Sequence, residues 1–503
     1  MRFTIVLILF FSLASNSSGQ RKSGLNGFTN KAEAKNIYKH RRKDGKWVEY
    51  FDVFSNETKD TAEIAYYRLS QYKNGSPYGP VRTYNKNGTL YSECFYEKGL
   101  INGVSKVYYL SGKVMFETPM VKGKPEGVVK EYFESGKLKD ECQYTDGNKN
   151  GIEKEYEENG KVSSETQYLN GVRSGTDKLY YRSGAIQFEI DYKNGLQNGM
   201  QKEYYENGKL KTEIPFVDNR ANGIGKEYYE DGRLKSETPY LCNAEMMEEL
   251  KKVDTNEISP FDFPLVIING IRKEYDENGI LSQETTFVIN EKNGIEKEYF
   301  TTGSLKAEYP YKEGMIEGLA KEYYQSGKLL KEIPYYNDSI NGMVKDYYES
   351  GELWQEAPFV NDKETGAQRM YYKSGKLNNT TTYLYDKPIG VSKGYYESGK
   401  LAVETPYKDG QINGVEKRYY EDGKLLESDP YTNGKANGIV KVFYPNGKLK
   451  IVIPYVDGVV NGDQKEYYEN GKLKCETSYL DNSVVSTKMY DEKGKEVKIN
   501  LEQ

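Results

Sequence analysis

Histidine is almost absent from this chain of 503 residues. His40 is the only histidine, and it lies in the basic run His40-Arg41-Arg42-Lys43. Histidine is the side chain that most often supplies acid–base catalysis and zinc ligation near neutral pH. The chain therefore lacks the residue type on which histidine catalysis and histidine-based metal sites depend. We expect no enzyme activity, no catalytic residues, no metal site and no cofactor.

Cysteine is also scarce and scattered, with only Cys94, Cys142, Cys242 and Cys475. Cys94 and Cys142 hold the same place in two units of the repeat described below. At two strands per unit they would lie roughly 19 Å apart, whereas a disulfide needs Cα atoms within about 7 Å. We expect four free thiols rather than a disulfide framework.

An excess of positive charge is missing, since the formal net charge is −5 and lysine alternates with glutamate. No basic stripe of the kind that binds nucleic acid is present. Long apolar runs are missing too, apart from Phe3 to Leu13. Because that run is short, follows Arg2 and precedes small residues, we predict a signal peptide over residues 1–19. The protein is then exported, to the periplasm, the cell surface or the medium.

What the chain has in abundance is a tyrosine followed four residues later by a glycine, in steps of 24 residues. A fixed period of this length is the signature of stacked repeats, in which each unit contacts mainly its neighbours. We expect sixteen units, interrupted once, whose structural turn residues are Gly88, Gly112, Gly136, Gly160, Gly184, Gly208, Gly232, Gly279, Gly303, Gly327, Gly351, Gly375, Gly399, Gly423, Gly447 and Gly471.

Positions in one unit are counted from its turn glycine, which is position 0. Position −4 is aromatic and position +2 aliphatic in all sixteen units, position +8 is aromatic in fifteen, and position −9 is always glycine. Asn-Gly, Asp-Gly or Ser-Gly between two short apolar segments is a strong hairpin signal. We predict an all-β fold, an elongated array of stacked antiparallel β-hairpins of about 24 residues that form a single twisted sheet or solenoid.

Two turn types remain open. A three-residue loop with a glycine bulge sets position −4 opposite +2 and gathers positions −8, −4, +2 and +8 on one apolar face. A two-residue turn sets the basic residue at −6 opposite position +5, which is glutamate in thirteen units. In either case these charges form ladders along the array, which disfavour slips of register.

The repeat divides the chain. Residues 20–70 carry weak repeat features and are expected to cap one end, and residues 487–503 cap the other. Residues 71–240 and 269–486 form two arrays. Residues 241–268 are an insertion with a short helix expected near Ala244 to Val253, which serves either as a tolerated surface loop or as a recognition loop or joint.

The unit, written G-x-x-Y-Y-x-D-G-x-L-x-x-E-x-x-Y with a following N-G, resembles the MORN repeat and specifically its bacterial variant, over roughly residues 72–480. The resemblance implies a scaffold, in some members associated with lipid, or a YwqK-type antitoxin of a toxin–antitoxin system. A cytoplasmic antitoxin needs no export signal, so the predicted signal peptide departs from that pattern.

The regular rows of tyrosine, lysine and glutamate favour multivalent contact with a protein or cell-surface partner. Our leading hypothesis is an exported, non-catalytic scaffold that binds along its sheet. Alternatives are an antitoxin or immunity protein, a carbohydrate or cell-wall binder whose tyrosines stack on sugar rings, and a membrane-associated scaffold. The candidate binding surface is the row at position −3, represented by Tyr205, Tyr229, Tyr324, Tyr348, Tyr396 and Tyr420.

Overall fold

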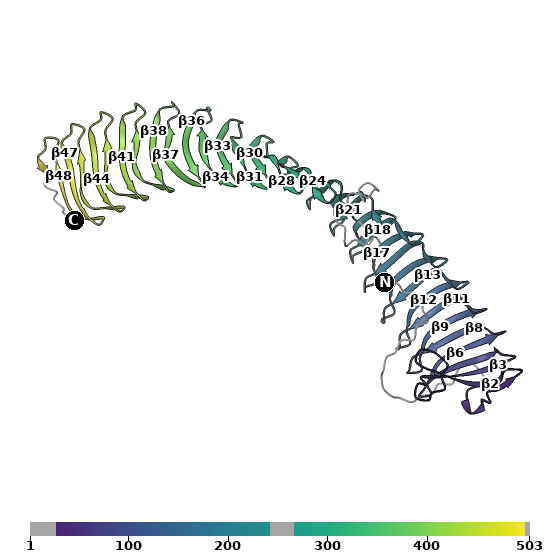
Figure 1. Cartoon of the computed structure of the whole chain (residues 1–503). Helices are drawn as coiled ribbons and strands as arrows, with labels where there is room; N and C mark the ends of the chain where they lie inside the picture. The colour runs from purple at the N-terminus through teal and green to yellow at the C-terminus, as the bar shows by residue number, and fades with distance from the viewer. Residues whose placement is uncertain (1–26, 242–265, 498–503) are drawn as a thin grey trace. The chain divides into compact units, whose positions relative to one another are not determined.

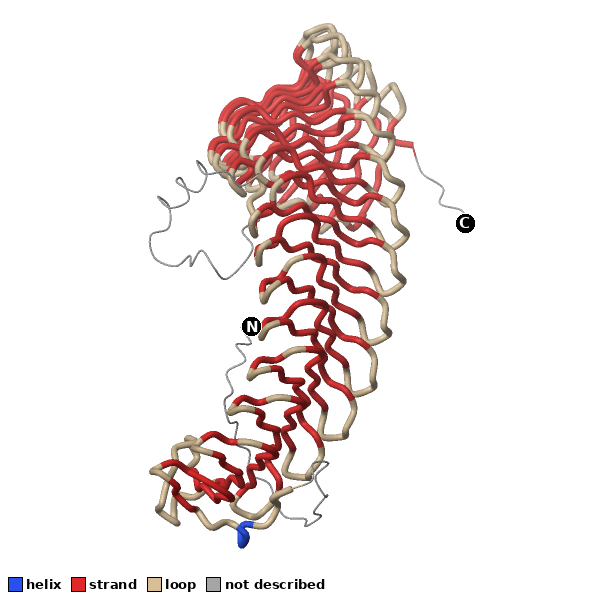
Figure 2. The backbone as a smooth tube through the Cα atoms, turned by 90° about the vertical axis from the view of Figure 1, so that its right-hand side faces the viewer, coloured by secondary structure: helices blue, strands red, loops and turns tan. Residues whose placement is uncertain are grey.

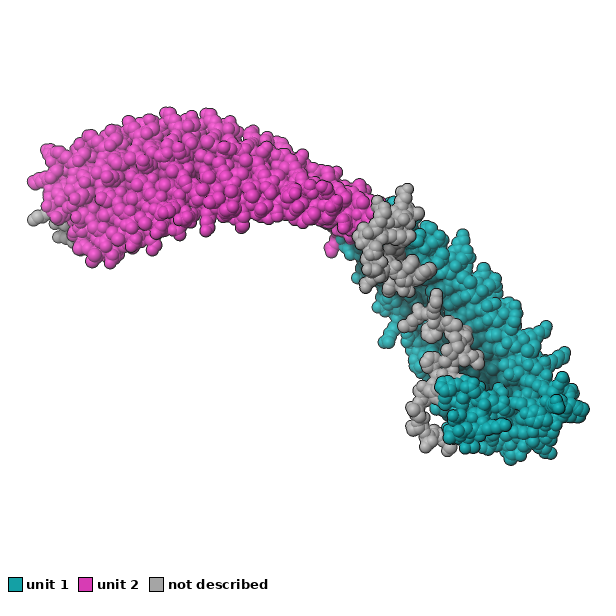
Figure 3. All heavy atoms as spheres, viewed as in Figure 1, with its two compact units in different colours: residues 1–267 teal, residues 268–503 magenta. Residues whose placement is uncertain are grey.

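The computed structural model describes residues 27–241 and 266–497. The chain divides into two compact units, residues 1–267 and 268–503, and each is described by itself (Figure 3). The predicted signal peptide, the expected helix of the insertion and Cys242 lie outside the described residues, so those expectations stay predictions.

Both units are built from β-hairpins, and the predicted fold class is confirmed. In the described residues the only helix is the short 3-10 turn η1 (Lys31–Glu33), and every strand ladder is antiparallel. Within each unit the strands lie side by side in one layer, with loops along both edges (Figures 1 and 2). A representative hairpin of the first unit is β21 (Gly223–Tyr228) with β22 (Leu234–Tyr240), and one of the second is β29 (Gly318–Tyr323) with β30 (Leu329–Tyr336).

The hairpin turn is the three-residue loop, one of the two types that the sequence left open. In β29–β30 the amide of Gly327 donates to the carbonyl of Tyr324 at 2.8 Å, and the amide of Tyr324 donates to the carbonyl of Lys328 at 2.8 Å. Each of the sixteen turn glycines has a positive φ, between 77° and 108°. Glycine reaches this left-handed region without the steric penalty that a Cβ brings.

A β-bulge follows the turn and reconciles the two expected pairings. Tyr323 lies opposite Leu329, as the three-residue loop requires, and the register then shifts by one residue at Leu330. As a result Lys321 lies opposite Glu332, the pair expected from a two-residue turn. The extra residue also strengthens the local twist of the strand.

The same shift makes one of our expectations wrong. Position +8, Tyr335 in this hairpin, lies opposite Gly318 at position −9, and so faces away from positions −8, −4 and +2. Ala320, Ile333 and Val344 at positions −7, +6 and −7 form the buried cluster, and Tyr335 packs against it. We call this side, with positions −7, −5, +4, +6 and +8, the core face. The opposite side, with positions −8, −6, −4, +5 and +7, is the ladder face.

Neighbouring hairpins are joined by two-residue return turns. Asn337 and Asp338 both have positive φ, 47° and 64°, and lead from β30 through β31 (Ser339–Ile340) into β32 (Gly342–Tyr347). Strand β30 pairs with β32 as well as with β29, so the ladder continues from one repeat to the next. Where β32 begins, Gly342 has φ 129°, and a Cβ there would lie 2.9 Å from Pro334 Cγ.

The first unit starts with strands that do not follow the repeat. Strand β1 (Ile37–Lys39) pairs with β2 (Arg42–Phe51), and β2 pairs with β3 (Tyr66–Lys73), the edge of the regular array. In the second unit, β47 (Leu473–Leu480) pairs with β48 (Ser483–Tyr490), which carries β49 (Glu496–Val497). Strands β1, β2 and β49 lie within the two regions that we expect to act as caps, and β3 and β48 cross the borders of these regions.

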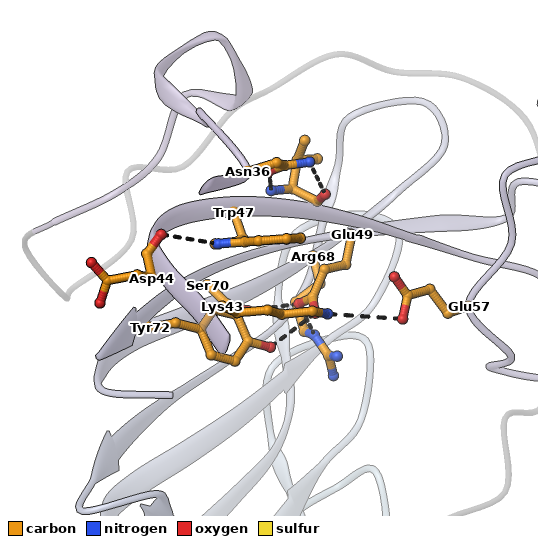
Figure 4. Close-up of polar contacts among 10 residues, drawn as sticks. Asn36, Lys43, Asp44, Trp47, Glu49, Glu57, Arg68, Ser70 and Tyr72 are labelled. Carbon is orange, nitrogen blue, oxygen red and sulfur yellow. Dashed lines mark hydrogen bonds and ion pairs between the residues drawn. The ribbon is translucent and has the colours of Figure 1, made fainter. Parts of the chain in front are cut away.

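A buried carboxylate holds the first strands together (Figure 4). Glu49 is 3% exposed and accepts hydrogen bonds from Lys43 at 2.6 Å, Tyr72 at 2.9 Å, and Ser70 and Arg68 at 3.2 Å. Burial alone raises the pKa of Glu49, but the bond from Lys43 and the charge of Arg68 outweigh it and lower the pKa. Because its oxygens are satisfied by internal donors, we assign this carboxylate a structural role.

Candidate binding surface

The middle of the ladder face is a row of alternating charges. The glutamate at position +5 lies between the basic residue of its own hairpin and that of the next, as Glu332 lies opposite both Lys321 and Lys345. Ion pairs within this row include Lys106–Glu117 at 2.8 Å, Lys154–Glu165 at 2.9 Å and Lys465–Glu476 at 3.1 Å. The hydrogen bond from Lys106 lowers the pKa of Glu117. The predicted charge ladders are therefore present, and they are nearly neutral along most of their length.

A second row links consecutive repeats through the tyrosine at position −4. Its hydroxyl donates to the position +5 glutamate of the preceding repeat at 2.6–3.0 Å, as in Tyr108–Glu93, Tyr132–Glu117, Tyr156–Glu141, Tyr180–Glu165, Tyr204–Glu189, Tyr228–Glu213, Tyr299–Glu284, Tyr323–Glu308, Tyr347–Glu332, Tyr371–Glu356 and Tyr419–Glu404. Burial, followed by the bond to Glu308, raises the pKa of Tyr323 to about 12. The invariant aromatic residue at this position thus has both a packing and a hydrogen-bonding role.

A third row on the ladder face is apolar and open to solvent. Position −8 is mostly aliphatic. It lies opposite position +7, which is proline in nine of the sixteen repeats, as in the pair Leu319 and Pro334. These aliphatic side chains stay exposed: Val104 46%, Val128 40%, Ile152 48%, Ile224 57%, Ile271 54%, Ile295 48%, Leu319 46%, Met343 37%, Val391 50%, Val415 43% and Ile439 51%. We call this set of side chains the aliphatic row. Aligned exposed apolar side chains of this kind mark interaction surfaces more often than scattered ones do.

The tyrosines at position −3, our candidate binding residues, lie at the turn edge and are half-buried. Their hydroxyls donate to the position −4 carbonyl of the next repeat: Tyr205 to Tyr228, Tyr324 to Tyr347, Tyr348 to Tyr371, Tyr396 to Tyr419 and Tyr420 to Phe443, at 2.7–3.0 Å. Tyr229 holds the same position in its own repeat. These hydroxyls join neighbouring repeats and are therefore engaged within the protein. Their role in binding stays a prediction. The aliphatic row belongs to positions that we expected to be apolar, but the sequence did not single it out as a binding surface.

The aliphatic row is interrupted in the first unit by a hollow of about 430 Å³. It forms where Gln167 and Asp191 replace the proline of position +7 and Thr176 replaces the aliphatic residue of position −8. Asp191 accepts hydrogen bonds from the Thr176 hydroxyl at 2.6 Å and the Met200 amide at 3.0 Å. The lining is mixed, polar and apolar: Ile152, Glu165, Gln167, Thr176, Lys178, Glu189, Asp191, Met200 and Lys202.

The charge ladder is interrupted in the second unit. In strands β40 (Gly414–Tyr419), β41 (Leu425–Thr432), β43 (Gly438–Phe443) and β44 (Leu449–Val456), position +5 is Ser428 and then Val452. The only non-tyrosine at position −4, Phe443, follows the repeat that carries Ser428, so hydroxyl and carboxylate are lost together. We call strands β40–β44 the irregular region.

The core face of the irregular region also departs from the repeat. Positions −7 and +6 of β40–β41 are Glu416 and Asp429, which lie opposite each other and are 7% and 6% exposed. Glu416 pairs with Arg418 at 2.8 Å, whereas one oxygen of Asp429 is buried without a hydrogen-bond partner. Burial and the charge of Glu427 raise the pKa of Asp429 to about 6.

Residues that could hold a metal do not come together in the described parts of the chain, since no group of three His, Cys, Asp or Glu side chains converges there. Cys94, Cys142 and Cys475 are free thiols. None of the helices within residues 27–241 and 266–497 has the length and apolar character to cross a membrane.

The 24-residue hairpin period agrees with that of a known repeat family. The family model described as MORN repeat variant matches residues 77–98, 101–122, 125–146, 149–170, 197–218, 221–241, 268–288, 292–313, 316–338, 340–361, 364–385, 388–409, 412–433, 436–457 and 460–481. The chain belongs to the MORN repeat variant family. Of the sixteen 24-residue repeats of this MORN repeat protein, only the repeat of Gly184 lies outside the matched segments. This repeat borders the hollow. The resemblance to this repeat is thus confirmed, and the chain is a repeat scaffold.

No curated protein matches the chain. Among solved structures, a crystal structure of TcdB2-TccC3 is similar at 11% identity and a TM-score of 0.13, with 86% of this chain and 27% of that chain covered. A Photorhabdus luminescens Tc holotoxin pore is similar at 11% identity and a TM-score of 0.10, with 91% and 30% covered. The chain thus spans less than a third of the length of these two structures.

Proposed function

We propose that this MORN repeat protein is an exported, non-catalytic scaffold that binds a partner protein along its ladder face. The observation that carries the proposal is the aliphatic row, which keeps large apolar side chains exposed in one repeat after another. Burying such a side chain is worth roughly 1.5–3 kcal/mol. Because the row recurs about every 9.6 Å, two strands further along the sheet, a long partner can make several weak contacts at once.

The test compares two triple variants of the full chain. The first replaces Ile295, Leu319 and Met343 of the aliphatic row by asparagine. The control replaces Val288, Val360 and Val456 by asparagine; these are equally exposed but lie at the return-turn edge, at position +9. The proteins serve as bait for an envelope fraction, and binding of each captured protein is titrated. We expect saturable binding that the first triple variant weakens at least tenfold and the control leaves unchanged. No saturable partner, or equal loss in both variants, would contradict the proposal.

Export is tested separately. Cell fractionation and N-terminal sequencing of the mature protein should place it outside the cytoplasm with Gln20 as its first residue. A cytoplasmic protein that retains Met1 or Arg2 would remove export from the proposal and leave the binding surface unaffected.

If the partner protein is an exported toxin, this scaffold acts as an antitoxin or immunity protein. Neutralising a toxin also requires an extended protein-binding surface. A toxin-like protein encoded next to this one, captured by the wild-type bait and lost with the first triple variant, would identify that form.

A second candidate function is glycan binding in the hollow of the first unit. Gln167, Thr176 and Asp191 supply amide, hydroxyl and carboxylate groups beside Met200, a mixture that suits a polyhydroxylated ligand with one apolar side. A glycan array tests it, with Asp191→Pro as the variant that restores the common residue of position +7. Binding that survives this substitution, or a blank array, would exclude the hollow as a glycan site.

A further inference from the structure

One stretch of the second unit departs from the even charge balance of the chain. Residues 430–456 contain Lys435, Lys441, Lys448 and Lys450 but no aspartate or glutamate. The rest of the chain is acidic, since the formal net charge of the whole chain is −5. A stretch with four lysines and no carboxylate is therefore a local feature, and it covers most of one repeat, hairpin β43–β44.

The lysines of the ladder row lose their partners here. Lys441 lies opposite Ser428 on one side and Val452 on the other, where other repeats have glutamate. Lys417 also lies opposite Ser428, and its other neighbour, Glu404, is within 3.8 Å of Lys393 and accepts the Tyr419 hydroxyl.

Lys417 and Lys441 are both exposed, and within the described ranges no carboxylate forms an ion pair with either. These two ammonium groups therefore stay available to an anionic partner.

The aliphatic row continues beside these lysines. Ile439 is 51% exposed and lies opposite Pro454, and Val415 is 43% exposed and lies opposite Pro430. Val452 adds an apolar side chain in the charge row itself. The resulting patch, made of Lys417, Ser428, Ile439, Lys441, Val452 and Pro454, combines positive charge with apolar surface.

We propose that this patch binds an acidic segment of a partner protein in a polyproline-II-like conformation, with a carboxylate at every third residue. The choice of an acidic protein segment follows from charge complementarity with two lysines that lack internal partners. The proposal rests on the proposed scaffold function and names the place and the chemistry of one contact.

The spacing fixes the conformation. Lys417 and Lys441 are successive basic residues of the ladder row and lie two strands apart, about 9.6 Å. A polyproline II helix has three residues per turn and rises about 9.3 Å per turn. Carboxylates at i and i+3 therefore lie on one side of the segment at nearly the spacing of the two lysines. Prolines or aliphatic residues between them can contact the aliphatic row.

The binding experiment uses the full chain and a fluorescein-labelled peptide of repeated Glu-Pro-Pro triplets. The comparison peptide has the same composition but all its glutamates at one end. Fluorescence anisotropy should give a roughly tenfold tighter complex with the triplet peptide, weakened by added salt because exposed ion pairs are screened. Equal affinity for the two peptides would overturn the proposed conformation, and no binding of either would overturn the site.

Variants that restore the ladder test the location. Ser428→Glu combined with Val452→Glu gives Lys441 the carboxylate neighbours found in other repeats, so the fold should be kept and binding should fall at least tenfold. Lys441→Gln should weaken binding about threefold to fivefold, since one exposed ion pair is worth up to about 1 kcal/mol. The control is Thr380→Glu, which restores the same residue at position +5 of another repeat and should leave binding unchanged.

The outcomes separate this site from the scaffold function. Wild-type affinity in the double-glutamate variant, with an unchanged circular-dichroism spectrum, would overturn the patch as the binding site. If the cellular partner depends on Ile295, Leu319 and Met343 but not on the patch, the scaffold function stands and this inference fails. If the triplet peptide binds the patch while the triple variant retains its cellular partner, the patch stands and the aliphatic row does not act as proposed.

Discussion

Hairpins β29–β30 and β43–β44 share a backbone but differ in what they carry on the ladder face. In both, position −4 lies opposite +2 and a bulge follows, and the two turn glycines have φ 83° and 84°. In the first, Lys321 lies opposite Glu332; in the second, Lys441 lies opposite Val452. The conformation thus depends on positions −9, −4, 0 and +2, whereas position +5 can vary, so a change there alters the surface without altering the fold.

The largest effect should come from the glycine at position −9. It should be the same in β43–β44, which begins at Gly438, and in the regular hairpin directly after β29–β30, which begins with β32 at Gly342. A Cβ at Gly342 would lie 2.9 Å from Pro334 Cγ, and one at Gly438 would lie 2.9 Å from Pro430 Cγ, each at a φ that disfavours other residues. We expect Gly342→Ala and Gly438→Ala each to cost about 3 kcal/mol, from strain and overpacking together. Urea unfolding measures both. A cost for one and not the other would show that the two hairpins do not share their backbone requirement.

Asp429, the buried carboxylate of the irregular region, should make the free energy of unfolding depend on pH, by up to about 3 kcal/mol. Because the folded pKa of Asp429, about 6, lies above the unfolded value, the folded state binds the proton more tightly. Its contribution to stability is therefore present below about pH 4 and is lost as the pH rises to about 6. Asp429→Asn should stabilise the protein at pH 7 and have little effect at pH 4, as thermal unfolding at the two pH values can show.

The matched control for that effect is in the regular hairpin, where the same positions are Ala320 and Ile333. Ile333→Val should lower the unfolding midpoint by a similar amount at both pH values, since no group there titrates. A pH-independent effect of Asp429→Asn would contradict the assignment of the unpartnered carboxylate.

The turn glycine should give the next effect. Gly327 has open space around the position of a Cβ, so only its φ of 83° resists substitution. We expect Gly327→Val to cost about 2 kcal/mol, because a β-branched residue strongly disfavours the left-handed region. Lys328→Val, one residue on, is the control and should be nearly neutral. Equal melting temperatures for these two variants would place the turn elsewhere.

The smallest effect should come from the hydroxyl of position −4, and it should be specific to the regular hairpin. Tyr323→Phe removes a 2.8 Å bond to Glu308 and should cost about 1 kcal/mol. Phe443→Tyr should bring no gain in the wild type, because Ser428 has replaced the acceptor, but should stabilise a Ser428→Glu background. A double-mutant cycle on Ser428 and Phe443 measures the coupling. A value near zero would show that the joint loss of hydroxyl and carboxylate is coincidental.

Much of this architecture could be predicted from the sequence, because each repeat gives an independent view of the same unit. The glycine loop follows from the pattern, and its pairing of position −4 with +2 is one of the two alternatives that the pattern left open. The arrangement of the faces could not be obtained in this way. A bulge at residues such as Leu330 leaves no distinctive residue type, so Tyr335 was placed on the wrong face.

The surface roles were harder to predict than the fold. The hydroxyl of Tyr324 bonds to a backbone carbonyl 23 residues away, a contact that depends on the stacking distance between repeats and not on the pattern within one. The irregular region did leave a signal. Ser428, Phe443 and Val452 are exceptions to the repeat within 25 residues of one another, and such clustered exceptions locate a candidate site once the register is known.

The missing tyrosine–glutamate bonds also have a mechanical consequence. Within each unit the repeats are joined in series, so tension along the stacking direction acts equally on every joint. In the first unit position +5 is glutamate in every repeat, whereas in the second it is Thr380, Ser428 and Val452 in three repeats. At the joint after Ser428 the backbone ladder and the Tyr420 hydroxyl remain, but the second side-chain link is absent. Under tension the second unit should therefore separate first at these joints. The first unit, whose joints all have the glutamate, should resist the same force more evenly along its length.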